Sequence, residues 1–421
     1  MFLTGRNWWD PSPLEKQESL IFAGFVRLMR QLSLSTYRGT ETTAIGIDED
    51  VSIDQKKELL TRLHSFLLPL LERQITNLLD LLDPFDLQEE TASKFQLILD
   101  IQSALEDTMG ELQSLLYTFC PELVRRPRSH YMNDQHLKEL KKLQLKGLDQ
   151  YFRRNDLHFH LSAVFAQSNL IIQELRLSSI PSCSSPSLPS IPRARKFLID
   201  HTSSSRKMIQ SMIDWLAASE LQHIQDLWLN EVSSIDRALV DCLVLINSSD
   251  TEEHNNQTSE SVIEPSAVNP RIKPVIQVAK SLIPVIKLSR MFLKKLSERA
   301  MNASRLPSFT EMDSDQLDRL SGTATQVRLS LDHILRTLKS TERRNHDGFT
   351  VMSYATAIQR DLQDALLHVV LHFVPRIPET QGFHGQNHYR TWFIVWLTQF
   401  KLAIQNLIDV TEVLPGPENN G

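Results

Sequence analysis

Apolar residues recur at steps of three and four along most of this 421-residue chain. Because 3.6 residues complete one turn of an α-helix, this spacing gathers them on one helical face. Two long examples are Leu60, Leu63, Leu67, Leu71, Ile75, Leu78 and Leu82, and then Phe95, Ile98, Ile101, Leu105, Met109, Leu112, Leu116 and Phe119. The pattern predicts long amphipathic helices packed into bundles, in an all-α fold.

The composition favours the same class. Only 12 glycines are present, which leaves few residues for the tight turns and phosphate-binding loops of α/β enzymes. The hydrophobic fraction of 41% is enough to form a core, and the length predicts two or three domains. The net charge of -6 predicts no overall attraction to nucleic acid or anionic membranes, so such binding would need a local patch.

Capping signatures place the first helices. The sequence Ser12-Pro13-Leu14-Glu15 predicts a helix start, since serine can cap, proline suits the first turn and glutamate can close a capping box. A second signature at 52–55 opens a helix that runs to about residue 82, and Pro69 should bend it because proline lacks a backbone N–H. A further helical segment is expected over 133–177, with a break near residue 155.

Polar stretches divide the chain. The serine- and proline-rich segment 178–192 predicts an exposed loop, and the polar, acidic segment 247–269 predicts a disordered linker. Between them a helix is expected over about 195–246, with an interruption near Ser219 left open. We therefore predict an N-terminal bundle of about five long helices over 1–246, a C-terminal four-helix up-and-down bundle over 270–414, and a disordered tail over 415–421.

The four C-terminal helices are expected at about 271–301, 313–344, 351–374 and 389–413. The second has a heptad pattern formed by Leu317, Leu320, Ala324, Val327, Leu331, Ile334 and Leu338, which favours shallow-angle bundle packing. The last contains the run 392–397, Trp-Phe-Ile-Val-Trp-Leu, which is apolar on all sides. It predicts a buried central helix, and the alternative is a site that another chain covers.

One helix carries a regular cationic stripe. Lys273, Lys280, Lys287 and Lys294 recur every seven residues, and Arg290 lies in the same stripe. Seven residues return to nearly the same helical face, so these side chains form a ridge opposite the apolar face. Such a ridge could bind phosphate, anionic lipid or an acidic protein. The alternative is a solvated outer face, partly paired with acids of a neighbouring helix.

The histidines do not form a recognisable metal motif. His368 and His372 are four residues apart, but the glutamate order of a zinc-protease helix is absent and the intervening residues are apolar. His158 and His160 are two apart, which on a helix points them away from each other. We therefore predict no metal ligands.

Motifs for catalysis are also absent from the sequence. It has no glycine-rich phosphate loop, nucleophile elbow, kinase signature or Cys-x-x-Cys pair. Its three cysteines, Cys120, Cys183 and Cys242, have neither disulfide-framework nor metal-site spacing, so we expect reduced thiols. These observations predict a protein that is not an enzyme and uses no cofactor.

Neither a signal peptide nor a membrane span is predicted. The first ten residues lack an apolar region, and no later run reaches the roughly 18 apolar residues that a span requires. An intracellular protein is expected. The basic cluster Arg125-Arg126-Pro127-Arg128 is too short to distinguish the nucleus from the cytoplasm.

Four segments carry a resemblance to a known family: 47–50 (Ile-Asp-Glu-Asp), 67–76 with its Leu-Leu-Pro start, 280–290 from Lys-Ser-Leu-Ile-Pro to Lys-Leu-Ser-Arg, and 309–312 (Phe-Thr-Glu-Met). Together they resemble a large, uncharacterised family of helical proteins from rust fungi, which implies no activity and no site residue. More loosely, the expected paired bundles are similar to cyclin-D-binding and vinculin-like helical proteins, which bind other proteins.

The sequence therefore favours a non-catalytic helical scaffold or adaptor that binds an unknown protein partner. The alternative is a binder of anionic lipid or nucleic acid that uses the cationic ridge. A helical-bundle enzyme whose site is assembled from distant side chains is a third reading.

Overall fold

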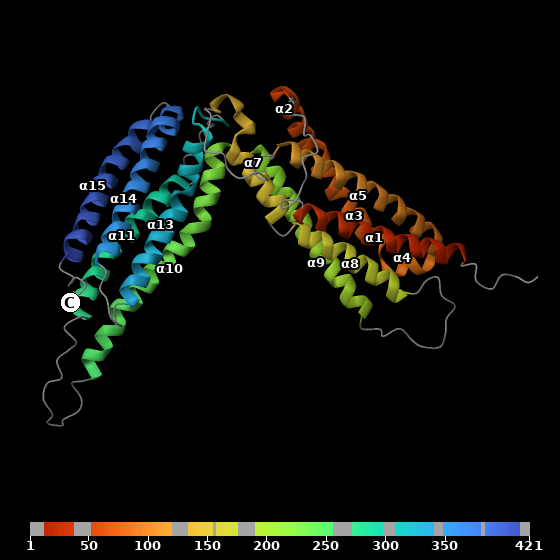
Figure 1. Ribbon diagram of the computed structural model, residues 1–421, viewed down its shortest axis with the longest axis horizontal. Coiled ribbons are helices and arrows are strands. Elements are labelled where there is room, and N and C mark those ends of the chain that lie inside the picture. Colours follow the sequence, from red (N-terminus) through yellow and green to blue (C-terminus); the bar gives the residue numbers. More distant parts are fainter. Residues whose placement is uncertain are drawn as a thin grey trace, which may run out of the picture. The chain divides into compact units, whose positions relative to one another are not determined.

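The structure, a computed structural model, describes residues 12–37, 52–119, 134–154, 157–175, 190–255, 272–297, 308–340, 348–379 and 384–412. Within these ranges every regular element is a helix and none is a strand (Figure 1). The predicted all-α class is confirmed. The segment 415–421, for which a disordered tail was predicted, lies outside the described residues.

The chain forms two compact units. Unit 1 comprises residues 1–130 and 139–217, and unit 2 comprises 131–138 and 218–421. The predicted division, with an N-terminal bundle over 1–246, is therefore wrong at its boundary. The helix breaks at Ser219, whose Oγ accepts the backbone N–H of Gln222 at 3.2 Å and so caps a new helix.

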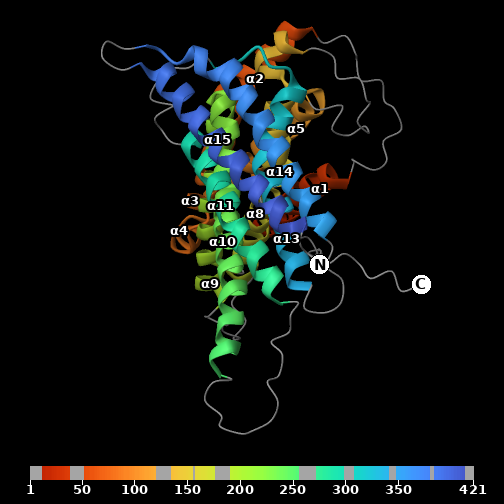
Figure 2. The ribbon, with the colours of Figure 1, turned by 90° about the vertical axis from the view of Figure 1, so that its left-hand side faces the viewer.

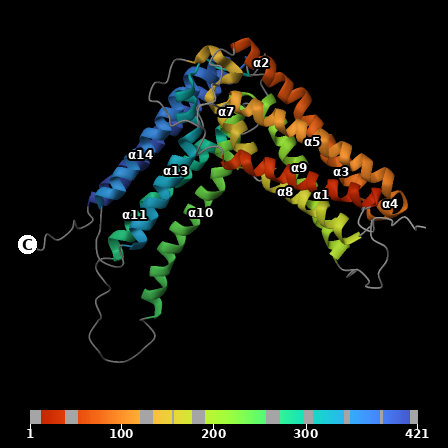
Figure 3. The ribbon, with the colours of Figure 1, turned by 45° about the vertical axis from the view of Figure 1, so that its right-hand side comes forward.

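The described residues of unit 1 form five long helical segments and several short elements. The elements are α1 (Pro13–Tyr37), α2 (Ile53–Arg62), η1 (Leu63–Leu67), α3 (Leu68–Leu81), α4 (Pro84–Glu89), α5 (Thr91–Phe119), α7 (Lys142–Asp149), η3 (Gln150–Arg154), α8 (Leu157–Leu175) and α9 (Ser190–Ala217). A short 3-10 turn, η2 (Gln135–Leu140), precedes α7, and its residues 135–138 belong to unit 2. Helix α1 packs against α5 and α8, α3 packs against α5 and α9, and α8 pairs with α9 (Figure 3).

The helices of unit 1 bury the apolar faces that the sequence predicts. On α1, Ile21, Phe25 and Leu28 are fully buried, and the ring of Phe25 stacks on that of Phe165 in α8. Burial of such side chains contributes about 1.5–3 kcal/mol each. The packing of one face per helix therefore supplies most of the driving force for this unit.

Two glycines permit close helix contacts in unit 1. The Gly24 backbone in α1 lies against the buried side chain of Gln102 in α5, whose Nε2 donates to the Ile21 carbonyl at 2.9 Å. The Gly147 backbone in α7 lies against the indole of Trp215 in α9, whose Nε1 donates to the Gln144 carbonyl at 3.0 Å. A β-carbon at either glycine would overlap these side chains.

Prolines mark two wide helical turns. A bend was predicted at Pro69, and the structure has a π-turn, η1, directly before α3, the helix that contains this proline. Proline has no N–H to give to the carbonyl four residues earlier, here that of Ser65, and a wider turn accommodates this. A second π-turn, η4 (Val369–Phe373), precedes Pro375 in the same way.

In its described residues, unit 2 has five long helices that run alternately up and down. They are α10 (Glu220–Asn255), α11 (Ile272–Ser297), α13 (Ser314–Ser340), α14 (Gly348–His368) and α15 (Gly385–Glu412). After α14 come η4 and η5 (Val374–Arg376). Helix α10 packs against α11 and α13, α13 against α14, and α15 against α14 and α11. Figure 2 shows this unit from the side of α15.

A four-helix bundle was predicted over 270–414, and the structure adds α10 to it as a further helix. Its fully buried residues include Ile224, Ile235 and Cys242, and its Trp228 donates Nε1–H to the Leu320 carbonyl of α13 at 3.0 Å. Composition alone placed a boundary at 247, but the helix continues to Asn255. Residues 247–255 are therefore helical and not a linker, and 256–269 lie outside the described residues.

Two other predictions have a mixed outcome. The predicted loop over 178–192 is wrong at its end, because α9 starts at Ser190 and accommodates Pro192 in its first turn; residues 178–189 lie outside the described residues.

In the run 392–397, Phe393 and Trp396 are buried as predicted, whereas Ile394 and Val395 are exposed. That helix is therefore amphipathic and not buried on all sides.

The heptad pattern of α13 is confirmed. All seven apolar positions from Leu317 to Leu338 are buried, with at most 1% of the side chain exposed. Its register therefore follows directly from the sequence.

The substitution Gly147→Ala is expected to destabilise unit 1 by about 1–3 kcal/mol, because the new methyl group must displace the buried Trp215 ring. Gly322→Ala in α13 is the matched control. Nothing lies within 4 Å of its β-carbon position, so this change should stabilise the helix by about 0.5–1 kcal/mol. Urea unfolding measured by circular dichroism compares them, and an unchanged midpoint for Gly147→Ala would show that the contact is dispensable.

Candidate functional site

The predicted cationic stripe lies on the outer face of α11. Lys280, Lys287 and Lys294 are exposed, and none of them forms an ion pair with another residue in the described ranges. The backbone of Lys273 belongs to the same helix, but its side chain lies outside the described residues. We call Lys280, Lys287 and Lys294 the α11 ridge.

Arg290 does not belong to this free surface. Its guanidinium forms an ion pair with the carboxylate of Asp236 in α10, and its Nη2 donates to Oδ2 at 3.3 Å. Pairing with an acid of the neighbouring helix was the alternative left open for the stripe. Arg290 therefore contributes to helix packing, whereas the three lysines are exposed to solvent.

Apolar side chains lie between the lysines of the α11 ridge. Pro284 and Met291 are exposed and lie between the lysines, and 46% of the Met291 surface is accessible. From Lys280 to Lys294 the helix rises about 21 Å, at about 1.5 Å per residue. The outer face of α11 therefore offers three charges at regular intervals with apolar surface between them.

Contacts on the inner face hold α11 in a fixed register. Its carbonyls accept hydrogen bonds from three buried side chains: Cys242 Sγ to Ala279 at 3.2 Å, Gln225 Nε2 to Leu296 at 2.7 Å, and Trp396 Nε1 to Leu288 at 2.9 Å. Phe292 packs on the Trp396 ring with centroids 4.5 Å apart. The ridge is thus carried by a rigid support.

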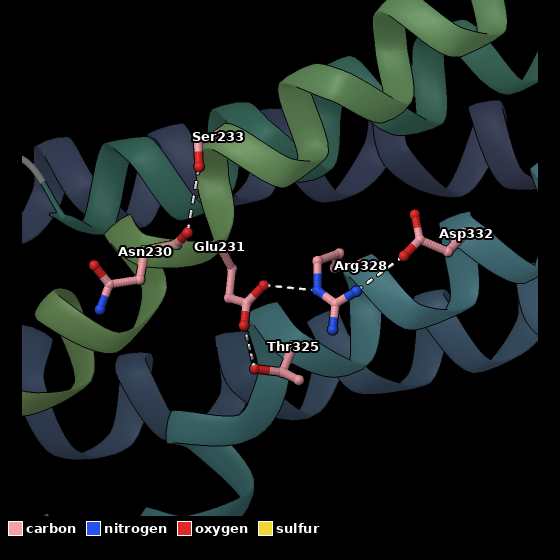
Figure 4. A network of polar contacts seen from close by, with 6 residues as sticks. All are labelled: Asn230, Glu231, Ser233, Thr325, Arg328 and Asp332. Atoms are coloured by element: carbon pink, nitrogen blue, oxygen red, sulfur yellow. Dashed lines mark hydrogen bonds and ion pairs between the residues drawn. The ribbon is translucent and has the colours of Figure 1, made fainter. Parts of the chain in front are cut away.

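A polar network joins α10 to α13 beside this support (Figure 4). The Glu231 carboxylate accepts Arg328 Nε at 2.7 Å and Thr325 Oγ1 at 3.1 Å, while Arg328 Nη1 donates to Asp332 at 2.9 Å. Each charged group in the network has an opposite partner. We therefore assign it to helix packing and not to chemistry.

His368 and His372 stack but do not make a metal site with other residues. Their ring centroids lie 6.1 Å apart. Burial of the His368 ring lowers its pKa, and the positive charges of Arg319 and His372 lower it further, against the opposing carboxylates of Asp364 and Asp313. These effects favour the neutral form of the half-buried imidazole.

A histidine contact that sequence reasoning missed lies in unit 1. His160 of α8 and His201 of α9 place their Nδ1 atoms 3.0 Å apart. In the sequence, the histidine near His160 is His158, two positions away, and a helix points these two apart. Because His201 is 41 positions away on another helix, the sequence gives no periodic signal for this pair.

The described part of the chain has no cluster of three or more possible metal ligands. No group of three or more His, Cys, Asp or Glu side chains there could hold a metal ion. Among the helices described, none combines the length and apolar character needed to cross a bilayer.

Two family models match the chain. Residues 56–217 match a domain of unknown function (DUF8723), and residues 219–409 match a second domain of unknown function (DUF8721). The two matches meet at the boundary between unit 1 and unit 2. No curated protein matches the chain. The resemblance to a rust-fungal family and to vinculin-like bundles stays a prediction.

The lowered pKa of His368 predicts a pH-dependent stability of unit 2. The unfolded chain binds this proton more readily, with a pKa of about 6.5, so stability is full above that value and falls as the pH drops below it. We expect His368→Gln to flatten the decline in unfolding free energy between about pH 7 and about pH 5. Urea titrations at several pH values measure it.

The substitution Arg319→Gln provides the second arm of this experiment. It removes a positive charge that lowers the His368 pKa, so it should reduce the same decline by a smaller amount. Identical pH profiles for wild type and both variants would contradict the assignment.

Cys242 is expected to be unreactive in the folded protein. Burial raises the pKa of its thiol to about 11, against a smaller lowering by Lys339, and the thiol donates to a carbonyl of α11. In a variant with Cys120→Ser and Cys183→Ser, labelling by iodoacetamide should follow the unfolding of unit 2 across a urea series. Rapid labelling without urea would show that α10 and α11 separate readily.

Proposed function

We propose that this protein is an intracellular, non-catalytic helical adaptor, which binds an acidic segment of a partner protein along the α11 ridge. The observation that supports it is the exposure of Lys280, Lys287 and Lys294 without ion-pair partners among the described residues. Exposed charges at an interface act mainly on specificity and association rate.

The spacing favours a helical partner. Seven-residue steps match two turns of a helix, so acids repeated every seven residues on a partner helix can face all three lysines. Pro284 and Met291 offer apolar contact between the charges, which an amphipathic helix can use. Lipid head groups or nucleic acid would use the lysines alone.

The second candidate function is the binding of an anionic lipid surface or nucleic acid by the same three lysines. The exposed cations support it, but their number is small for a surface that depends on charge alone. Such binding would weaken steeply as the salt concentration rises.

The ridge variant Lys280→Glu, Lys287→Glu, Lys294→Glu tests both candidates. We expect it to weaken binding of a fluorescent acidic amphipathic peptide, with glutamate every seven residues, by at least about tenfold. Anionic vesicles and duplex DNA serve as parallel probes, and fluorescence polarisation or co-sedimentation gives the affinity at low and moderate salt. Binding of vesicles or DNA but not of the peptide would replace the first candidate with the second.

A matched control carries the same charge change elsewhere on unit 2. Arg336→Glu, Arg390→Glu and Lys401→Glu alter three exposed cations on α13 and α15. This control should bind the peptide as the wild type does, and both variants should keep the helical circular dichroism signal. Equal loss in both triple variants would mean that net charge, and not the ridge, governs binding.

A further inference from the structure

Two histidines of unit 1 face each other across a helix pair. Nδ1 of His160 in α8 lies 3.0 Å from Nδ1 of His201 in α9, and the ring centroids are 5.3 Å apart. In a neutral pair at this distance, one Nδ1 carries a proton and the other offers a lone pair. Both nitrogens that a metal would need are therefore already directed into the same space.

Aromatic side chains orient the two rings. Phe159 meets His160 and His201 edge-on, at centroid distances of 5.4 and 5.7 Å, and Phe197 stacks on His201 at 6.4 Å. Phe159 is 62% exposed and Phe197 is 40% exposed. The pair is thus reached from solvent through an aromatic rim that restricts ring motion.

The nitrogen separation fits a shared metal ion. Two imidazole nitrogens bound at about 2.0–2.1 Å to one ion lie about 2.9–3.3 Å apart, for bond angles between square and tetrahedral. The observed 3.0 Å lies in this interval. Once the donor ring has lost its Nδ1 proton, rotation of each ring directs both Nδ1 lone pairs toward a common point.

We propose that His160 and His201 bind one divalent transition ion of the kind that prefers imidazole, such as Zn²⁺, Ni²⁺ or Cu²⁺, through their Nδ1 atoms. The ring that donates in the metal-free state moves its proton from Nδ1 to Nε2, so both rings stay neutral and no charge is lost. Water completes the coordination, because the described residues offer no third His, Cys, Asp or Glu ligand.

Metal binding would clamp α8 to α9. An ion that binds only the folded pair stabilises unit 1 according to its concentration and affinity. Protons compete with the metal for the same nitrogens, so metal binding weakens in acid. Mg²⁺ and Ca²⁺ prefer oxygen ligands and are excluded by this donor set.

Thermal unfolding of the full-length, chelator-stripped protein tests the site. Added Zn²⁺ or Ni²⁺ should raise the unfolding temperature of unit 1 by a few degrees, and Mg²⁺ should not. His160→Gln and His201→Gln should each abolish the rise relative to their own metal-free proteins. His158→Gln, which alters a histidine of the same helix, should retain it.

Electron paramagnetic resonance with Cu²⁺ gives a direct readout. The wild type should show nitrogen hyperfine structure from two imidazoles, and each single variant should lose it. A temperature rise of equal size in all variants, or a wild type with neither the rise nor the two-nitrogen spectrum, would overturn the proposal.

Discussion

Buried side-chain donors that reach the backbone of a neighbouring helix determine how the helices of both units pack. A helical carbonyl retains a second lone pair after its own helical hydrogen bond, and a side chain of another helix can use it. Gln102 and Gln74 do so between α1, α3 and α5, and Trp228 does so between α10 and α13. Apolar packing alone tolerates sliding, whereas each such bond specifies one register.

The elements of the fold could be predicted from the sequence because helix formation is local. The heptad from Leu317 to Leu338 predicts the buried face of α13. Pro69 predicts a bend, and the structure has the π-turn η1 beside it. The partners of each helix could not be predicted. Composition separated α10 from α11 at residue 247, yet Cys242 and Ala279 show that these helices share one core.

The candidate sites show the same limit. Spacing located Lys280, Lys287 and Lys294 on an outer face, since helical periodicity relates residues of one element. It could not show that Arg290 faces Asp236, because the acid belongs to another helix. Nor could it bring His160 to His201, which are joined only by the packing of α8 on α9.

The two faces of α11 can vary independently. The inner face is fixed by Gln225, Cys242 and Trp396, whose donors bond to backbone carbonyls and not to α11 side chains. Substitution of the outer lysines therefore removes no contact that determines the helix register. A surface whose charges can change without loss of packing can adapt to a partner at little cost in stability, which is the physical basis for expecting charge reversal on the ridge to alter binding and leave the fold intact.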